Sequence, residues 1–451
     1  MIAKFNIHSI LENELKNKSI NMSQLNKITG INRGTLSQIF NNKPQQLPSI
    51  AQLDKITAAL NHQAGYFYDL YIESYFDQST PHWKRLKPLL YQCVKLGLII
   101  QIERILELLM EDLSHTRTIF ALAEEWHSDG YIQELLPFYE CIIKNEKFRH
   151  AEHVAISHYR IFRLSLSEDD FEANLRAAIR FEPYRNEMPI DYCLNSLFKL
   201  TNIYFSMHEW EKSMLYADEM RVLSNYVYEC KLHLKKSDLE NETFLLDRHL
   251  VTYYGHSYLM IGVCLEEQKK YQESLNYVQK YENLEWFEGL NEDGQNEVNK
   301  LKIFAKANFL SLNILLGNQS YLNKYTNFLE KNPSEILPGL MTILQSANKY
   351  EFEVNYIIDK FYYIFDYNGE DELIIDSYYS VLNTLDRYEI LYRQMAIYYF
   401  RNGNYTEGIQ YISKCLAVSN RINKKSDFAE YPELLNLLKE WSLLLSEKKE
   451  T

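Results

Sequence analysis

The sequence of 451 residues has few residues that interrupt helices and few that form disulfides. It contains only 14 glycines, 10 prolines and 6 cysteines. Because turns depend on glycine and proline, this scarcity argues against a fold of many short strands. The cysteines occur singly, with no Cys-x-x-Cys pair, so we expect buried thiols in a reducing compartment instead of disulfides or a zinc site. They are Cys93, Cys141, Cys193, Cys230, Cys264 and Cys415.

Segments that would direct the chain to a membrane are also missing. The first residues, MIAKFNIHSILENELK, lack the pattern of a signal peptide. The longest apolar stretch, Leu86 to Met110, is interrupted by Lys95, Glu103 and Glu107, and it predicts an amphipathic core helix. We therefore expect a cytoplasmic, soluble protein with no membrane partner.

Catalytic motifs are absent from the sequence as well. It has no phosphate-binding glycine loop, no HExxH, no GxSxG and no paired-cysteine metal site. The 12 histidines are dispersed, and the pair His150 and His153 lies in a charged segment typical of a helix surface. We expect no catalytic residue, no metal and no cofactor, and hence a protein that is not an enzyme.

What the chain does contain is helical periodicity. Its composition, 46% hydrophobic and 24% charged, is that of a folded protein with a large core. Leucine, glutamate, lysine, asparagine and tyrosine recur at helical spacing through most of its length. The predicted fold class is all-α.

Residues 21–43, NMSQLNKITGINRGTLSQIFNNK, predict two short helices joined by a sharp turn. In the first helix Leu25 and Ile28 are spaced to share one face, Gly30 supplies the turn, and Ile31 fills the corner. The apolar stripe continues into the second helix at Leu36, Ile39 and Phe40. The layout is that of a helix-turn-helix that reads DNA, although a polar helical hairpin within a larger bundle has the same local pattern.

With a preceding helix near Ile7–Lys16 and a following one near Ser49–Leu60, the region resembles an Xre/Cro-type five-helix DNA-binding domain. The resemblance implies that Asn32 caps the recognition helix and that Arg33 and Gln38 read bases. Met22 and Asn42 depart from the family pattern. The resemblance implies DNA contacts by Asn32, Arg33, Thr35, Ser37, Gln38, Asn41 and Lys43.

Charge is unevenly distributed between the two parts of the chain. Residues 1–62 hold seven basic and three acidic residues, a net charge of +4, whereas the whole chain carries −13. Only the amino-terminal part therefore suits a polyanion. Because this surplus is modest, we expect a homodimer that places two such domains on a two-fold operator.

Beyond this domain, helix pairs recur with a small residue in the first helix and an aromatic residue opening the second, which is the tetratricopeptide pattern. The best copies are 194–220, 255–278 and 389–412, whose second helices begin at Trp210, Tyr271 and Tyr405. Since one hairpin cannot bury both faces, such hairpins stack into a right-handed solenoid with a concave wall. The predicted architecture is an Xre-type domain (1–70), a helical connector (71–88), a degenerate tetratricopeptide-like superhelix (89–430) and a capping or dimerisation helix with its tail (431–451).

This combination resembles the RRNPP-type peptide-pheromone receptors of Gram-positive bacteria, which include Rap, NprR, PlcR and PrgX proteins, and the AimR-type arbitrium receptors of phages. The resemblance implies that a short signalling peptide binds the concave wall and alters dimer geometry and DNA binding. Wall positions follow from the helical period, and asparagines there could pair with a peptide backbone. The candidate peptide-binding residues are Asn195, Phe198, Asn202, Phe205, Arg160, Arg163, His256, Arg393 and Arg401.

Three functions remain open at this stage. The first is a DNA-binding regulator controlled by a peptide. The second is a DNA-binding regulator controlled by a protein partner. The third is a Rap-like adaptor or phosphatase-type interaction protein whose amino-terminal domain docks protein instead of DNA.

Overall fold

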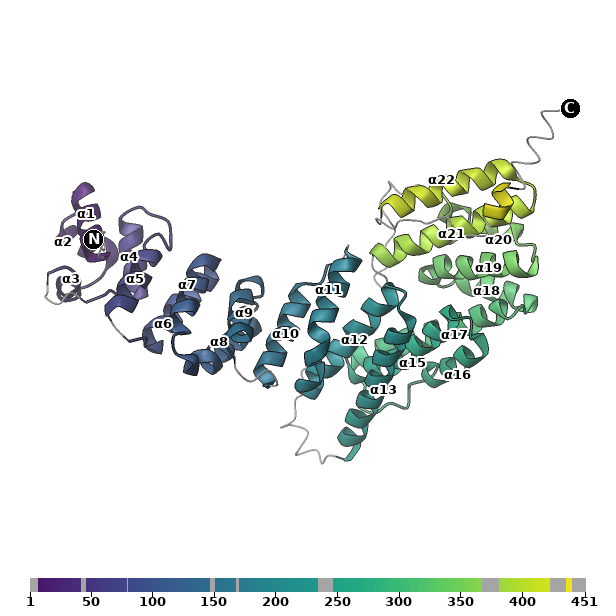
Figure 1. Ribbon diagram of the computed structural model, residues 1–451, viewed down its shortest axis with the longest axis horizontal. Coiled ribbons are helices and arrows are strands. Elements are labelled where there is room, and N and C mark those ends of the chain that lie inside the picture. The colour runs from purple at the N-terminus through teal and green to yellow at the C-terminus, as the bar shows by residue number, and fades with distance from the viewer. Residues whose placement is uncertain are drawn as a thin grey trace. The chain divides into compact units, whose positions relative to one another are not determined.

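The computed structural model describes residues 7–41, 46–78, 80–146, 151–167, 170–233, 246–366, 381–421 and 435–439. Every regular element within these ranges is helical, which confirms the predicted all-α class (Figure 1). The chain divides into two compact units, which are described separately. Unit 1 comprises Met1–Leu164 and Pro183–Met188, and unit 2 comprises Ser165–Glu182 and Pro189–Thr451.

Unit 1 is a succession of short helices. They are α1 (Ile7–Asn17), α2 (Met22–Thr29), α3 (Arg33–Phe40), α4 (Ile50–Ala59), α5 (Tyr68–Gln78), α6 (Trp83–Lys95), α7 (Ile99–Leu109), η1 (Leu113–His115), α8 (Thr116–Ser128), η2 (Gln133–Leu135), α9 (Leu136–Asn145) and α10 (Glu152–Leu164); η3 (Glu182–Glu187) follows α11 in the chain. The helices predicted near Ile7–Lys16 and Ser49–Leu60 correspond to α1 and α4.

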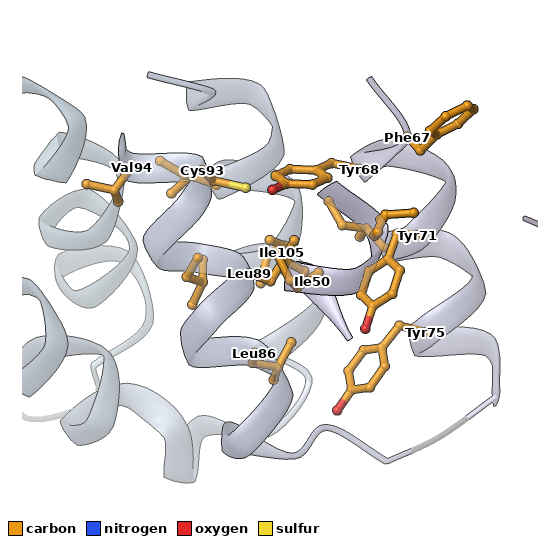
Figure 2. Packing of buried hydrophobic residues seen from close by; sticks show 14 of the residues in the cluster. Ile50, Phe67, Tyr68, Tyr71, Tyr75, Leu86, Leu89, Cys93, Val94 and Ile105 are labelled. Atoms are coloured by element: carbon orange, nitrogen blue, oxygen red, sulfur yellow. The ribbon is translucent and has the colours of Figure 1, made fainter. Parts of the chain in front are cut away.

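A single hydrophobic core runs through unit 1, from Ile7 to Val154. The aromatic rings of α5 and the leucines of α6 face this core, and Tyr71 and Leu89 are among its buried members (Figure 2). The first five helices therefore share their core with those that follow. The domain boundaries at residues 70 and 88 stay predictions.

Two details of the sequence prediction are wrong in unit 1. Ile28 is 59% exposed, and Thr29 takes the buried position beside Leu25. The expected helix Leu86–Met110 is two helices, because Gly97 adopts a left-handed conformation (φ +66°) after α6. Its neighbour Leu98 donates its amide to the carbonyl of Cys93 at 2.9 Å, a closure typical of a helix end.

Unit 2 contains the longest helices that the structure describes, α13 and α17, with 24 residues each. Its helices are α11 (Phe171–Phe181), α12 (Ile190–Ser206), α13 (Trp210–His233), α15 (Leu250–Glu267), α16 (Tyr271–Tyr281), α17 (Glu292–Leu315), η4 (Gln319–Tyr321), α18 (Leu322–Leu329), η5 (Pro333–Glu335), α19 (Ile336–Tyr350), α20 (Asn355–Lys360), η6 (Tyr362–Ile364), α21 (Val381–Arg401) and α22 (Tyr405–Arg421). In this unit α12 contacts α15, α15 contacts α17, α17 contacts α19, and α19 contacts α21.

The three best predicted hairpins have the same connector. Each places a left-handed residue two positions before the aromatic residue that opens the second helix: His208, Lys269 and Gly403. In each hairpin, the residue that follows the left-handed residue donates its amide to the carbonyl five residues before its own position, at 2.8–2.9 Å. The predicted second-helix starts at Trp210, Tyr271 and Tyr405 are confirmed.

Two of these hairpins also have a hydrogen bond between their two helices at the same position. The Ser213 hydroxyl donates to the Thr201 carbonyl at 2.9 Å, and the Ser274 hydroxyl donates to the Gly262 carbonyl at 2.7 Å. Both bonds span twelve residues, and both serines are buried. Small residues at these places therefore allow the two helices of a hairpin to pack closely.

Of the predicted final segment 431–451, only residues 435–439 lie within the described residues, and they are helical. Leu437 and Leu438 pack against a buried cluster of α21 formed by Ala396, Ile397 and Phe400. No helix among the described residues is both long and apolar enough to traverse a lipid bilayer.

Candidate nucleic-acid interface

Helices α2 and α3 form the candidate interface. α2 begins with a capping box, in which the Asn21 side chain accepts from the Gln24 amide and the Gln24 side chain accepts from the Asn21 amide. It ends at Gly30, whose φ of +68° is readily adopted only without a Cβ. The Gly30 amide donates to the Asn26 carbonyl at 2.9 Å. The sharp turn is thus defined by local sequence.

Side-chain hydrogen bonds fix the corner between the two helices. The Thr29 hydroxyl donates to the Leu25 carbonyl at 2.7 Å and accepts from the Ile31 amide at 3.2 Å. The Asn26 side chain donates to the Ile31 carbonyl at 2.7 Å. Ile31 itself is 6% exposed. The direction of α3 relative to α2 is therefore determined by buried contacts as well as by the turn.

α3 separates its apolar and polar side chains by face. Its amino end is capped by Asn32, whose side-chain oxygen accepts from the Thr35 amide at 2.8 Å. Its buried residues are Leu36, Ile39 and Phe40. Of the predicted DNA contacts, Asn32, Arg33, Gln38 and Asn41 are exposed and Thr35 and Ser37 are partly exposed; Lys43 lies outside the described residues.

Two of these polar residues already have partners within the motif. Arg33 Nη2 donates to the Ser23 hydroxyl of α2 at 3.0 Å, a contact that sequence reasoning missed. Thr35 Oγ1 donates to Asn32 Oδ1 at 3.0 Å. Ser23 thereby holds Arg33 over the α2–α3 junction, while Gln38 keeps its amide exposed. Both Arg33 and Gln38 retain donors suited to base edges or phosphates.

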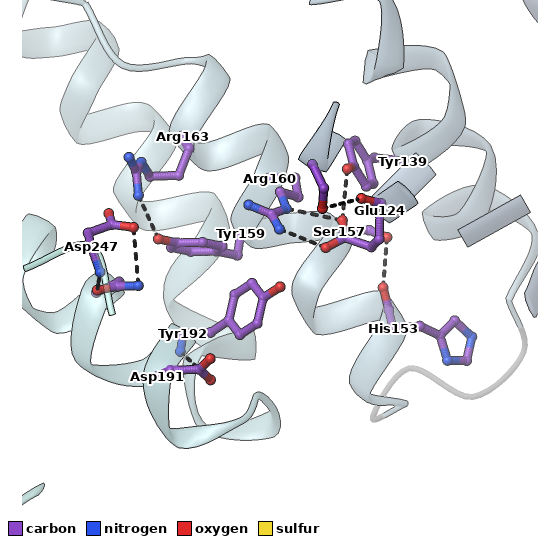
Figure 3. Close-up of polar contacts among 12 residues, drawn as sticks. Glu124, Tyr139, His153, Ser157, Tyr159, Arg160, Arg163, Asp191, Tyr192 and Asp247 are labelled. Atoms are coloured by element: carbon purple, nitrogen blue, oxygen red, sulfur yellow. Dashed lines mark hydrogen bonds and ion pairs between the residues drawn. The ribbon is translucent and has the colours of Figure 1, made fainter. Parts of the chain in front are cut away.

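Two predicted peptide-binding residues belong to unit 1 and are engaged there (Figure 3). Arg160 of α10 donates to both carboxylate oxygens of Glu124 on α8, at 3.1 and 2.6 Å, and Tyr139 donates to the same carboxylate at 2.8 Å. Arg163 donates to the Tyr159 hydroxyl at 2.7 Å. Burial acts to raise the pKa of Glu124, but Arg160 outweighs it and the pKa is lowered.

Unit 2 brings three of the predicted wall residues together. The ring of Phe198 on α12 packs at a tilt against His256 of α15, with ring centroids 4.4 Å apart. Asn195 accepts from the Tyr253 hydroxyl and from the Asp247 amide. Asn195 is only 5% exposed, so the expectation of an exposed wall position is wrong for this residue. The reason is that α15 packs against α12 at this turn.

His256 is partly exposed, but its Nε2 atom is shielded and has no hydrogen-bond partner among the described residues. Burial lowers the pKa of His256 to about 3, and the nearby charges of Lys300 and Arg248 add to the effect. The ring is therefore neutral at physiological pH. A neutral, shielded imidazole beside Phe198 offers one hydrogen-bond acceptor or donor and a flat apolar surface.

The remaining four predicted wall residues of unit 2 have contacts of their own. Asn202 donates to the Phe198 carbonyl of its own helix at 2.7 Å, and Phe205 packs on Trp210 with ring centroids 5.1 Å apart. On α21, Arg393 is partly buried and Arg401 is exposed. A role for any of them in peptide binding stays a prediction.

Potential metal ligands do not gather among the described residues: no group of three or more His, Cys, Asp or Glu side chains there could hold an ion. His153 pairs with Glu146 at 2.8 Å, and His150 falls outside the described residues. The six cysteines are free thiols.

Comparison with known families identifies a domain at the amino-terminal end of the chain. Residues 11–70 match the Cro/C1-type HTH DNA-binding domain. The match covers most of α1, all of α2, α3 and α4, and the start of α5. No curated protein shows significant similarity to the chain. The amino-terminal part is therefore a Cro/C1-type DNA-binding domain, followed by a long region whose described elements are all helical.

Proposed function

We propose that this chain is a transcriptional regulator that reads DNA with α3 and responds to a short peptide bound by unit 2. The observation that carries the DNA-binding part is the two-faced character of α3. Leu36, Ile39 and Phe40 anchor it in the core, whereas Arg33 and Gln38 face solvent. A helix fixed in this way offers its polar face to the major groove without rearrangement.

A dimer follows from the energetics of this surface. The amino-terminal region carries a net charge of only +4, and phosphate neutralisation supplies much of the affinity of such proteins. Two copies on a two-fold operator would double the number of phosphate and base contacts. The proposed active form is therefore a homodimer.

The proposal that unit 2 binds a peptide rests on its repeated hairpins. Three hairpins have the same left-handed connector, and two of them share a serine-to-carbonyl bond across the same twelve residues. Equivalent contacts at equivalent positions support a tetratricopeptide-like stack. Such stacks bind extended peptides through polar side chains on their inner helices.

One experiment tests both halves of the proposal. The full-length protein is screened by calorimetry against synthetic short peptides encoded near its gene, and each binder is added to a DNA retardation assay. We expect a peptide to bind and to change the affinity for DNA. If no peptide binds and a protein partner changes DNA affinity instead, peptide control is refuted while DNA binding stands. If neither the protein nor its complexes bind DNA, the regulator is refuted.

A further inference from the structure

Glu266 occupies an unusual position in the last turn of α15. Its carboxylate accepts from the Ser311 hydroxyl of α17 at 3.4 Å, and that hydroxyl lies 3.1 Å from the Thr342 hydroxyl of α19. Ser311 and Thr342 are 4% and 9% exposed. Helix α15 contacts α17, and α17 contacts α19. Each of these three helices thus contributes one polar group to the same place.

No cation compensates the carboxylate of Glu266 among the described residues. The titratable groups that interact with it are Glu267 on its own helix and the hydroxyls of Tyr271 and Tyr281 on α16. Glu335, before α19, acts on Tyr281 and adds a further negative charge there. Burial raises the pKa of Glu266 to about 8, and the neighbouring Glu267 adds to the shift. The nearby Lys349 directs its ammonium group elsewhere, over the rings of Tyr350 at 4.8 Å and Tyr271 at 5.7 Å.

An ionised carboxylate in this setting would be costly for the folded chain, which is why the pKa of Glu266 is raised. Desolvating a charge without a partner is unfavourable, and glutamine would make the same hydrogen bond with Ser311 without that cost. A second polar group lies one helical turn beyond Thr342: the Ser346 hydroxyl is 1% exposed and has no hydrogen-bond partner among the described residues. A carboxyl group without a nearby cation and a buried hydroxyl without a hydrogen-bond partner are both features of ligand sites.

We propose that Glu266, with Ser311 and Thr342, is the subsite that receives a cationic group of the bound peptide, an ammonium or a guanidinium. This assignment rests on the proposed peptide-binding function and specifies the chemistry of its ligand. The cationic group of the peptide supplies the positive charge that the described residues do not place beside Glu266. The two hydroxyls orient the carboxylate toward this group. Because the free carboxyl holds a proton at neutral pH and must ionise to pair with a cation, binding releases a proton.

The test uses two pools of N-acetylated random hexapeptides. One pool carries a single arginine or lysine in every member, and the other lacks arginine, lysine and histidine. Each pool is passed over full-length wild-type protein, the E266Q variant and the E267Q variant, and the retained peptides are identified by mass spectrometry. E267Q is the control, because it removes one negative charge from the same turn of α15 and leaves the Glu266 carboxyl in place. Since Glu267 raises the pKa of Glu266, its removal should make Glu266 ionise more readily and should not weaken cation binding. Circular dichroism and the melting temperature check that each variant is folded.

We expect the wild type and E267Q to retain members of the cationic pool and E266Q to lose affinity for the same peptides by roughly tenfold to a hundredfold. Calorimetry of one retained peptide at pH 7 in buffers of different ionisation enthalpy should show proton release with the wild type and not with E266Q. Equal retention by folded E266Q, or binding without proton release, would refute the subsite while leaving peptide control intact. Retention of neither pool by the wild type would refute both.

Discussion

Arg160 donates two hydrogen bonds to the carboxylate of Glu124 and thereby ties α10 to α8. The two side chains are 16% and 21% exposed, and Tyr139 of α9 completes the group. Because this guanidinium already faces a carboxylate, a peptide carboxylate would have to compete with Glu124 for it. The geometry favours a structural brace across three helices of unit 1.

Replacing Arg160 with alanine should therefore destabilise the protein. We expect a loss of about 2 to 3 kcal/mol in the free energy of unfolding, since Glu124 is left partly buried without its partner. R160K should recover only part of this, because lysine cannot make the two-pronged contact. Urea unfolding followed by circular dichroism measures the change. An R160A variant with unaltered stability but weaker peptide binding would assign Arg160 to the ligand instead.

Removing the amino-terminal cap of α3 should lower the stability of the fold, whereas removing the neighbouring Arg33 side chain should weaken DNA binding. Because Asn32 satisfies the Thr35 amide, N32A should lower stability by about 1 kcal/mol, whereas N32S and N32D should retain most of it. R33A, by contrast, should leave the melting temperature unchanged and weaken DNA binding. Thermal melts of the four variants provide the comparison. Loss of stability in R33A similar to that in N32A would mean that the Arg33–Ser23 contact is mainly structural.

Close helix packing in unit 2 predicts a large effect at one glycine. A Cβ at Gly255 in α15 would overlap with Leu301 Cδ1 and would lie 2.9 Å from Leu284 Cδ1. G255A should therefore cost about 1 to 3 kcal/mol despite the better helix propensity of alanine. G34A in α3 is the control, because its Cβ would meet only Asn32 Oδ1 at 3.4 Å. Equal melting temperatures for G255A and the wild type would contradict this packing.

The raised pKa of Glu266 predicts a pH dependence of stability. The folded state keeps the proton up to about pH 8, whereas the ordinary pKa is 4.5. The stability associated with this proton is complete below pH 4.5 and is lost as the pH rises through 8. Between pH 6.5 and 8.5 the wild type should lose roughly 1 to 2 kcal/mol more than E266Q. Parallel urea curves at the two pH values test this, and identical losses would mean that Glu266 has an ordinary pKa.

The local elements were predictable where local residues determine them. Gly30 marks the turn of the helix-turn-helix, and Trp210 and Tyr271 mark the starts of second helices, because turns and helix ends depend on neighbours in sequence. Ile28 was misplaced since the rotation of a short helix is set by what packs against it, and Thr29 satisfies its hydroxyl within the helix and can be buried.

Side-chain partners in the candidate sites could not be read from the sequence. Glu124 and Arg160 are 36 residues apart, and Asn195 and Tyr253 are 58 apart. Helical period indicates which face a residue occupies, but the neighbouring helix decides whether that face is exposed. The period therefore suggested Asn195 as a wall residue, while packing of α15 buries it.

The most direct measurement of the central claim is selection of DNA from a random duplex library by the purified full-length protein. The wild type should enrich one sequence motif with two-fold symmetry. The R33A/Q38A variant should enrich none while keeping the helical circular dichroism of the wild type. Failure of the wild type to enrich any motif, or enrichment of the same motif by the double variant, would contradict DNA reading by α3.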